Sequence, residues 1–412
     1  MKKFSIFVVL AVFLALAFIG ILPGEILADG DETLGPPVGI SIESGSNILL
    51  AGTGLSKQQP GTIDITIPYG VTIKQVLLYW QGIRNPDNTI SINGTEITGI
   101  LIGTAYYDRF CYRADITAGR FVIPGPNSLS ISGLTFDISN GAGLLVIIDD
   151  GFNAAQIALR DGDDFAYAPL DSPYDTTVAQ TISFNAEDVD RKATLSMFFS
   201  SVSGTASGGD FRPTAIEVTV GGTTTVYNDL LDSVDGEEWD TLKLSVDIPA
   251  HADSLTVQAL SVDNLGEGTR NPASFDWLVG ALSVRPPSGG EGCTPGYWKQ
   301  KHHFDSWVNY EPGDLFSDVF GATIKIRYGK KRKKITNPTL LQALQAKGGG
   351  INALARHTVA ALLNAASPAV SYDLYVDEVI DEFNAVYPGT NQDYNMLKNL
   401  FESLNQQGCP LN

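Results

Sequence analysis

Five aspartates gather in one stretch of the chain and could hold a metal ion. Two of them, Asp149 and Asp150, end a predicted strand, and three fall in the loop expected after it: Asp161, Asp163 and Asp164. Calcium takes six to eight oxygen ligands, and clustered carboxylates at the loops of a β-sandwich supply them. The spacing is not that of an EF-hand, because Gly162 comes too early and no bidentate glutamate follows at the right distance. The sequence therefore leaves two readings open, a calcium site or solvated loop acids.

A second feature with chemical meaning is a basic run, with seven cations within ten residues. They are Lys325, Arg327, Lys330, Lys331, Arg332, Lys333 and Lys334. The alternation in residues 323–327 and the break at Tyr328-Gly329 predict a protruding hairpin. Such a charge density attracts wall polymers, acidic polysaccharide or anionic lipid. The alternatives are a solvated loop, or a loop docked on the acidic body of the protein itself.

Three cysteines allow one disulfide and leave one thiol over. Cys293 and Cys409 stand at the two borders of one segment, so we expect them to pair. Closing so long a loop stabilises a fold by about 4–5 kcal/mol in the chain-entropy model. Cys111 is then expected as a buried, small hydrophobic residue. It could instead pair with one of the other two cysteines or with a second chain.

His302, His303, His357 and Cys293 raise the possibility of a zinc site. Zinc is usually held by closely spaced pairs of ligands, whereas these two histidines are adjacent and the chain has no Cys-x-x-Cys. Oxidation of Cys293 in an exported protein also removes its thiolate. We therefore favour a structural role, with His357 buried and hydrogen-bonded to Asn364, a backbone carbonyl or Trp298.

Motifs of catalysis are missing from the sequence. There is no Gly-x-Ser-x-Gly elbow, no His-Glu-x-x-His and no phosphate-binding loop. Exposed tryptophans would bind sugars; of the five, Trp80, Trp277 and Trp298 have the surroundings of core residues, whereas Trp239 lies in an acidic turn and is expected to be exposed. The sequence thus gives no positive support for an enzyme.

Charge is distributed unevenly along the chain, whose formal net charge is −19. From residue 290 to the end, twelve acidic and twelve basic side chains cancel. The first 28 residues carry +1, so residues 29–289 carry about −20. A body this acidic repels nucleic acid and favours basic partners or divalent cations.

The first 28 residues have the features of a secretory signal peptide. Lys2 and Lys3 precede a long apolar run, Pro23-Gly24 interrupts it, and Ala28 offers a small residue for cleavage. The alternative is an uncleaved membrane anchor, since a run of roughly 20 apolar residues can span a bilayer. A second apolar span is absent from the sequence.

Short strand-like segments separated by turn signals fill residues 29–285. Residues 76–80 are almost entirely apolar, as in a strand buried on both faces, and Asn93-Gly94 marks a two-residue hairpin. The fold class expected is mainly β, with one or two antiparallel β-sandwich or jelly-roll domains. We divide them into residues 29–155 and 156–285, the latter being a second sandwich or half of one large sandwich.

After a Pro- and Gly-rich linker at residues 286–292, apolar residues recur at helical spacing. Gly348-Gly-Gly350 separates two of the expected helices. Residues 293–412 are therefore expected to form a small bundle of four or five short helices, closed by the Cys293–Cys409 disulfide.

This last segment resembles a C-terminal module of secreted and cell-surface bacterial proteins. The shared pattern is Cys-Thr-Pro-Gly-Tyr-Trp-Lys at 293–299, the segments 339–344, 348–350 and 354–365, and a terminal Gly-Cys-Pro-Leu. The resemblance covers about a quarter of the chain, and the basic insertion at 324–334 departs from it. It implies an exported protein in which the module follows adhesion-type β-sandwich domains, and it supplies no established chemistry.

Together these features predict an exported, non-catalytic protein of the cell surface or extracellular matrix. Its role would be adhesion or scaffolding, with partners among surface polymers, polysaccharides or matrix proteins. The alternative from a different class is a secreted carbohydrate-binding or glycan-hydrolysing protein.

Overall fold

The computed structural model describes residues 33–40, 42, 45–68, 71–153, 155–266, 271–286, 290–329 and 333–411, except for the side chains of 45 and 150–153. The predicted signal peptide (1–28) and the middle of the predicted linker (287–289) lie outside these residues. No helix in the described part combines the length and apolar character needed to cross a membrane.

Residues 45–153 fold into two facing antiparallel sheets, the first sandwich. The larger has the order β1 (Gly45–Gly54), β9 (Ile138–Asn153), β3 (Thr72–Ile83), β7 (Arg109–Asp115) and β6 (Ile100–Ala105). The smaller has the order β2 (Gly61–Ile67), β8 (Gly125–Ser132), β4 (Thr89–Ile92) and β5 (Thr95–Thr98). A 3₁₀ turn, Thr117–Gly119, links β7 to β8.

Residues 156–284 form a second sandwich of the same kind, with four strands in each sheet. One sheet has the order β10 (Gln156–Ala166), β17 (Phe275–Val284), β12 (Arg191–Ser200) and β15 (Trp239–Ile248). The other has the order β11 (Gln180–Ser183), β16 (Ser254–Leu260), β13 (Ala215–Val220) and β14 (Thr223–Asn228). All pairings between these strands are antiparallel.

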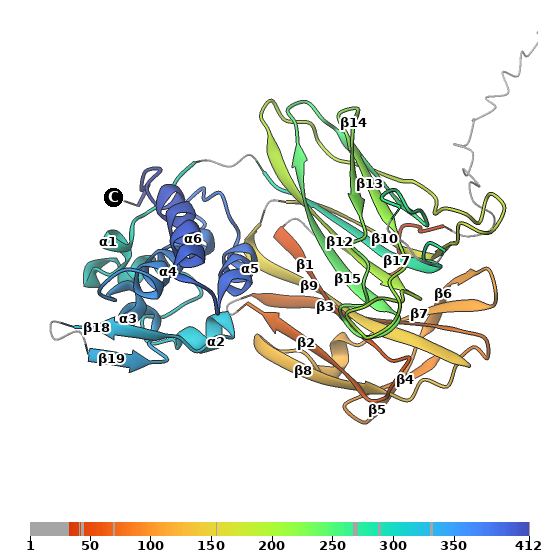
Figure 1. The fold of residues 1–412 in the computed structure, drawn as a ribbon. Coiled ribbons are helices and arrows are strands. Elements are labelled where there is room, and N and C mark those ends of the chain that lie inside the picture. The colour runs from red at the N-terminus through yellow and green to blue at the C-terminus, as the bar shows by residue number, and fades with distance from the viewer. Residues whose placement is uncertain are drawn as a thin grey trace, which may run out of the picture.

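Alternation of apolar and polar residues explains which sheets face water. In β2 every second side chain is buried, as expected for a sheet with one solvent face. In β3, by contrast, Val76 to Trp80 are all buried. The reason is that the five-stranded sheet and the β10–β17–β12–β15 sheet pack against each other through a separate core containing Tyr79, Phe198 and Trp239. The four sheets therefore stack in layers (Figure 1).

The C-terminal segment is helical, which confirms the predicted change of period. Its elements are α1 (Pro295–Trp298), a 3₁₀ helix (Lys301–Ser306), α2 (Phe316–Phe320), the strands β18 (Lys325–Tyr328) and β19 (Lys333–Thr336), α3 (Leu340–Leu344), α4 (Ile351–Ala366), α5 (Val376–Val386) and α6 (Asn391–Leu404). The described part thus holds six α-helices rather than four or five, because α1 and α2 are single turns too short to show a period.

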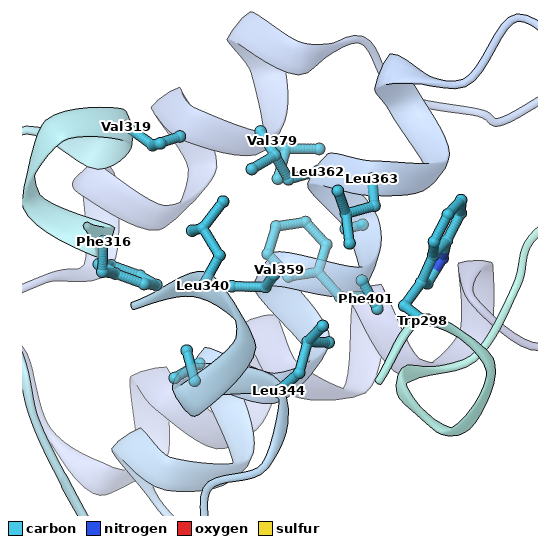
Figure 2. Close-up of a cluster of buried hydrophobic side chains, with 14 of the residues drawn as sticks. Trp298, Phe316, Val319, Leu340, Leu344, Val359, Leu362, Leu363, Val379 and Phe401 are labelled. Atoms are coloured by element: carbon cyan, nitrogen blue, oxygen red, sulfur yellow. The ribbon is translucent and has the colours of Figure 1, made fainter. Parts of the chain in front are cut away.

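One core holds this helical module together. Helix α4 lies at its centre, and side chains from the other helices, among them Trp298, Phe316 and Phe401, converge on it (Figure 2). Residue Thr339 caps α3 through a capping box with Gln342, and Thr390 caps α6 in the same way with Asp393. The predicted disulfide is confirmed, with Cys293 and Cys409 bonded and their Cα atoms 4.4 Å apart. The predicted fold class is therefore correct.

Helix α5 fixes the helical module against the sandwiches. Lys243 of β15 forms ion pairs with Asp381 at 2.8 Å and with Asp377 at 3.3 Å. At the end of β17, Arg285 pairs with Glu378, and its guanidinium lies 4.5 Å from the centre of the Tyr375 ring. The module is thus held by contacts as well as by the chain that joins it to β17.

Candidate functional sites

The basic run forms the hairpin that the sequence predicts. Strands β18 and β19 pair antiparallel, with Lys325 opposite Thr336 and Ile326 opposite Ile335. Ile326 is buried in the core of the helical module, so alternation turns the neighbouring side chains outward. The exposed cations are Lys325, Arg327, Lys333 and Lys334; Lys330, Lys331 and Arg332 lie outside the described residues.

Backbone hydrogen bonds anchor this hairpin to the module. The N–H of Arg327 donates to Oδ1 of Asn352 at 2.6 Å, and the N–H of Lys347 donates to the carbonyl of Arg327 at 2.7 Å. The hairpin lies at the end of the module away from the sandwiches (Figure 1). No ion pair between described residues joins its cations to an acidic side chain. The described cations of the hairpin are therefore not docked on the acidic body of the protein.

The three aspartates expected in a loop lie instead inside a strand. Asp161, Asp163 and Asp164 belong to β10 and are buried, so the expectation of solvated loop acids is wrong. Asp161 forms an ion pair with Arg113 and accepts a hydrogen bond from the hydroxyl of Tyr79 at 3.1 Å. Asp161 thus finds its polar partners in the facing sheet, whereas Oδ2 of Asp164 accepts from the N–H of Val178 at 3.0 Å within its own sandwich.

The other two aspartates do not join them in a cation site. Asp149 pairs with Lys74 at 3.3 Å, and the side chain of Asp150 lies outside the described part of the chain. Within that part, no three His, Cys, Asp or Glu side chains are arranged to hold a metal ion. Among the residues that the structure describes, the calcium hypothesis therefore finds no ligand set.

A second ion pair between the sandwiches was not foreseen from the sequence. Arg109 of β7 contacts Asp276 of β17 at 2.6 Å, and both side chains are buried. The guanidinium also lies 4.3 Å from the centre of the Phe165 ring, a cation–π contact. Burial raises the pKa of Asp276 well above that of a free aspartate. The two partners stand 167 residues apart, so no local pattern could pair them.

Of the two residues assigned a structural role, Asn364 is the one that organises the helical module. Its Oδ1 accepts from the N–H of Cys293 at 2.8 Å and from Nε1 of Trp298 at 3.0 Å. Its Nδ2 donates to the carbonyl of Cys293 at 2.9 Å and to Oδ1 of Asn405 at 2.8 Å. Four buried hydrogen bonds thus meet on one side chain.

His357 is buried as expected, but it does not bond to Asn364. Its Nε2 lies 3.8 Å from Oε1 of Glu402, and burial lowers its pKa to about 4, so the ring is neutral at physiological pH. The ring of His303 stacks on Tyr297 with centroids 3.8 Å apart, and Cys293 is in the disulfide. These contacts occupy three of the four residues that raised the zinc hypothesis.

Trp239 is buried, which corrects the expectation that it is exposed. Its ring lies against Gly52, Gly141 and Gly143, where an added Cβ would come within 2.1 to 2.8 Å of it. The acidic turn before it is bound to the first sandwich, since the N–H of Gly54 donates to the carbonyl of Asp235 at 2.8 Å and Lys57 pairs with Glu237 at 3.0 Å. Trp80, Trp277 and Trp298 are fully buried, as predicted, and so is the free thiol of Cys111.

Comparison with known proteins gives little more. No protein-family pattern and no curated protein matches the chain. Among solved structures, PNGF-II is similar over 58% of this chain and 65% of its own, less than two thirds of its length, with 12% identity and a TM-score of 0.22. A peptide-N(4)-(N-acetyl-beta-D-glucosaminyl) asparagine amidase matches over 58% and 96% with 10% identity and a TM-score of 0.23. The ANX2 ectodomain from Arabidopsis thaliana matches over 62% and 90% with 8% identity and a TM-score of 0.20. TM-scores this low support no argument about the fold or the function of this chain. The three proteins are reported only as structures to which it is similar.

Proposed function

We propose that this is an exported, non-catalytic protein of the cell surface or extracellular matrix that attaches to anionic polymers through the β18–β19 hairpin. The observation that carries the proposal is the display of Lys325, Arg327, Lys333 and Lys334 on a hairpin that is anchored at its base and turned away from the acidic sandwiches.

Charge separation gives this attachment a direction. Residues 29–289 carry about −20, whereas the hairpin concentrates positive charge at the far end of the helical module. A polyanion is attracted to the hairpin and repelled by the sandwiches, so the protein is held end-on with its sandwiches projecting. This orientation suits a scaffolding or adhesion role.

The disulfide supports the exported location. Bonds of this kind form and persist outside the reducing cytosol, and this one closes a module between residues 116 positions apart. The apolar N-terminal segment read as a signal peptide fits the same location.

The test is binding to immobilised alginate, a polyuronate, with neutral dextran as the reference surface. Replacing Lys325, Lys333 and Lys334 with serine should raise the dissociation constant at least tenfold at low salt. Wild-type binding should also weaken as salt rises, since the Debye length falls to about 8 Å at 0.15 M. The matched control replaces Lys192, Lys299 and Lys301, which are exposed lysines outside the hairpin, with serine.

The control removes the same charge, so it separates the hairpin from net charge. Loss in the hairpin variant with retention in the control supports the proposal. Equal binding by the wild type and the hairpin variant, or equal loss in both variants, would contradict it.

A further inference from the structure

A buried cysteine and a buried glutamine lie directly opposite each other on neighbouring strands of the first sandwich. Cys111 of β7 and Gln81 of β3 are register partners, and both are 0% exposed. Residues paired in this way point to the same face of a sheet, with their Cβ atoms about 5 Å apart. That face packs against the second sandwich, because Cys111 belongs to the core between the two. The thiol of Cys111 and the amide of Gln81 are therefore neighbours inside this core.

The amide of Gln81 is only half satisfied. Its Oε1 accepts a hydrogen bond from Nδ2 of Asn140 at 2.5 Å. Its Nε2 is also buried, yet it has no hydrogen-bond partner among the residues that the structure describes. Buried donors almost always have an acceptor, and a donor left without one is costly. A reaction that released this nitrogen would remove the unpaired donor.

Asn140 reaches the amide because β9 carries a β-bulge at this point. Gln81 pairs with Gly141, whereas the next residue of β3 pairs with Ser139. Asn140 is thus the extra residue of the bulge, and it is 0% exposed. Bulges re-aim side chains and are frequent beside active sites. A donor aimed at a carbonyl oxygen stabilises the negative charge that develops there when a nucleophile adds to the carbon.

The second sandwich closes over this group. Gly103 of β6 is the other register partner of Cys111, and a Cβ added to it would lie 2.5 Å from the backbone nitrogen of Asp163 in β10. A Cβ added to Gly141, the register partner of the glutamine, would lie 2.7 Å from the ring of Trp239. Glycine at these two positions lets β10 and the indole lie directly over the pair. The cover keeps bulk water away from the thiol and the amide.

We propose that Cys111 and Gln81 form an internal thioester that joins β7 to β3. The sulfur adds to Cδ of Gln81, and Asn140 bonds the Oε1 that carries the negative charge in the tetrahedral intermediate. The bond between Cδ and Nε2 then breaks, and the nitrogen leaves as ammonia together with the thiol proton. No electrons are gained or lost, so the step needs no oxidant.

The state of the thiol fits this route. Burial, with the charges of Asp163 and Asp161, raises the pKa of the Cys111 thiol, so the sulfur carries its proton until the reaction. That proton is the one that the departing nitrogen needs.

The thioester would be an acylating group for primary amines. Inside the core it is protected from hydrolysis, as reactive intermediates are in closed active sites. Unfolding, or separation of the two sandwiches, would expose it to small amines and lysine side chains. The inference does not rest on the proposed function of the basic hairpin, since none of its residues belongs to the helical module.

The experiment is intact-mass spectrometry of the full chain, purified without added amines or thiols and then unfolded in guanidinium at neutral pH. The disulfide-bonded wild type should be lighter than the sequence of the purified chain by one ammonia molecule, and iodoacetamide should find no thiol. Ammonia loss at Asn93-Gly94 through a cyclic imide would leave the thiol reactive, so the two readouts together identify the bond. Methylamine present during unfolding should restore one reactive thiol and convert Gln81 to its N-methylamide.

Variants assign the bond to these residues. Cys111→Ala and Gln81→Met, which lack the nucleophile and the amide, should both have their full mass. Gln300→Met is the matched control, because Gln300 is exposed in the helical module, and it should keep the loss of ammonia. Asn140→Leu removes the donor while keeping a branched side chain of similar size, and it should lower the converted fraction at least tenfold.

The wild-type measurement decides the proposal whether or not any variant folds. A full mass with a reactive thiol at Cys111 would overturn it. So would a thiol that becomes reactive only after a reductant is added, or an ammonia loss that persists in Cys111→Ala. Full conversion in Asn140→Leu would refute the role given to that amide.

Discussion

The side-chain amide of Asn364 pairs with both backbone groups of Cys293, accepting from its N–H at 2.8 Å and donating to its carbonyl at 2.9 Å. This pairing fixes the first residue of the helical module against its central helix. The disulfide partner Cys409 follows α6, so the same contact positions both ends of the module.

Replacing Asn364 with alanine should destabilise the module by about 3–5 kcal/mol, because it leaves several buried donors and acceptors without partners. Urea denaturation followed by tryptophan fluorescence measures the change. Asn395→Ala is the matched control, since Asn395 is exposed on α6, and it should change stability by less than about 0.5 kcal/mol. Similar stabilities for the two variants would show that the amide has no organising role.

Reduction of the Cys293–Cys409 bond should lower the stability of the module by about 5 kcal/mol, the chain-entropy value for a closed loop of 116 residues. The measurement is the urea midpoint of the Cys111→Ala variant with and without reductant, which removes the free thiol from the comparison. Mass spectrometry must confirm both thiols in the reduced sample. An unchanged midpoint in that sample would argue against a stabilising role for the bond.

The free energy of unfolding should fall as the pH rises from 5 to 8, in part because of Glu238. Its pKa is raised from 4.5 to about 7 in the folded protein, so over this range the folded state binds a proton that the unfolded state has lost. Folding then weakens as the pH rises toward 7. Glu238→Gln should remove this contribution to the pH dependence. The free energy of unfolding of the variant, relative to that of the wild type, should then be about 1–2 kcal/mol higher at pH 8 than at pH 5.

The control for this pH experiment is Glu96→Gln, whose exposed side chain should leave the profile unchanged. Thermal denaturation at closely spaced pH values gives both profiles. Parallel curves for the wild type and Glu238→Gln would mean that this carboxyl does not titrate in the range.

Trp239→Ala should cost about 3–5 kcal/mol, because the ring fills the core between the two sandwiches and its removal leaves a cavity. The comparison variant is Val226→Ala, which is 42% exposed on β14 and should be close to neutral. Since the ring is buried, Trp239→Ala should not act by removing a ligand contact. Stability close to that of the wild type would contradict its place in this core.

The sequence by itself determined the kind of structure in each half of the chain. Alternation in segments such as β2, the Asn93-Gly94 turn and the helical spacing after residue 293 are local signals, and each follows from the backbone geometry of strands, turns and helices. The disulfide followed from the placement of Cys293 and Cys409, and the basic hairpin from its alternation and its central break.

Only the tertiary structure decided which polar residues are buried and which aromatic residues are exposed. Asp161 and Trp239 have the local sequence of a loop and a turn, yet the facing sheet covers both of them. It supplies Arg113 as the partner of Asp161, and Trp239 lies in the core between the two sandwiches. Tyr106 and Tyr107 come from one connection and Tyr174 from another, and no spacing in the sequence relates them. Burial and convergence depend on contacts between segments distant in the chain, and these are set by how the sheets stack.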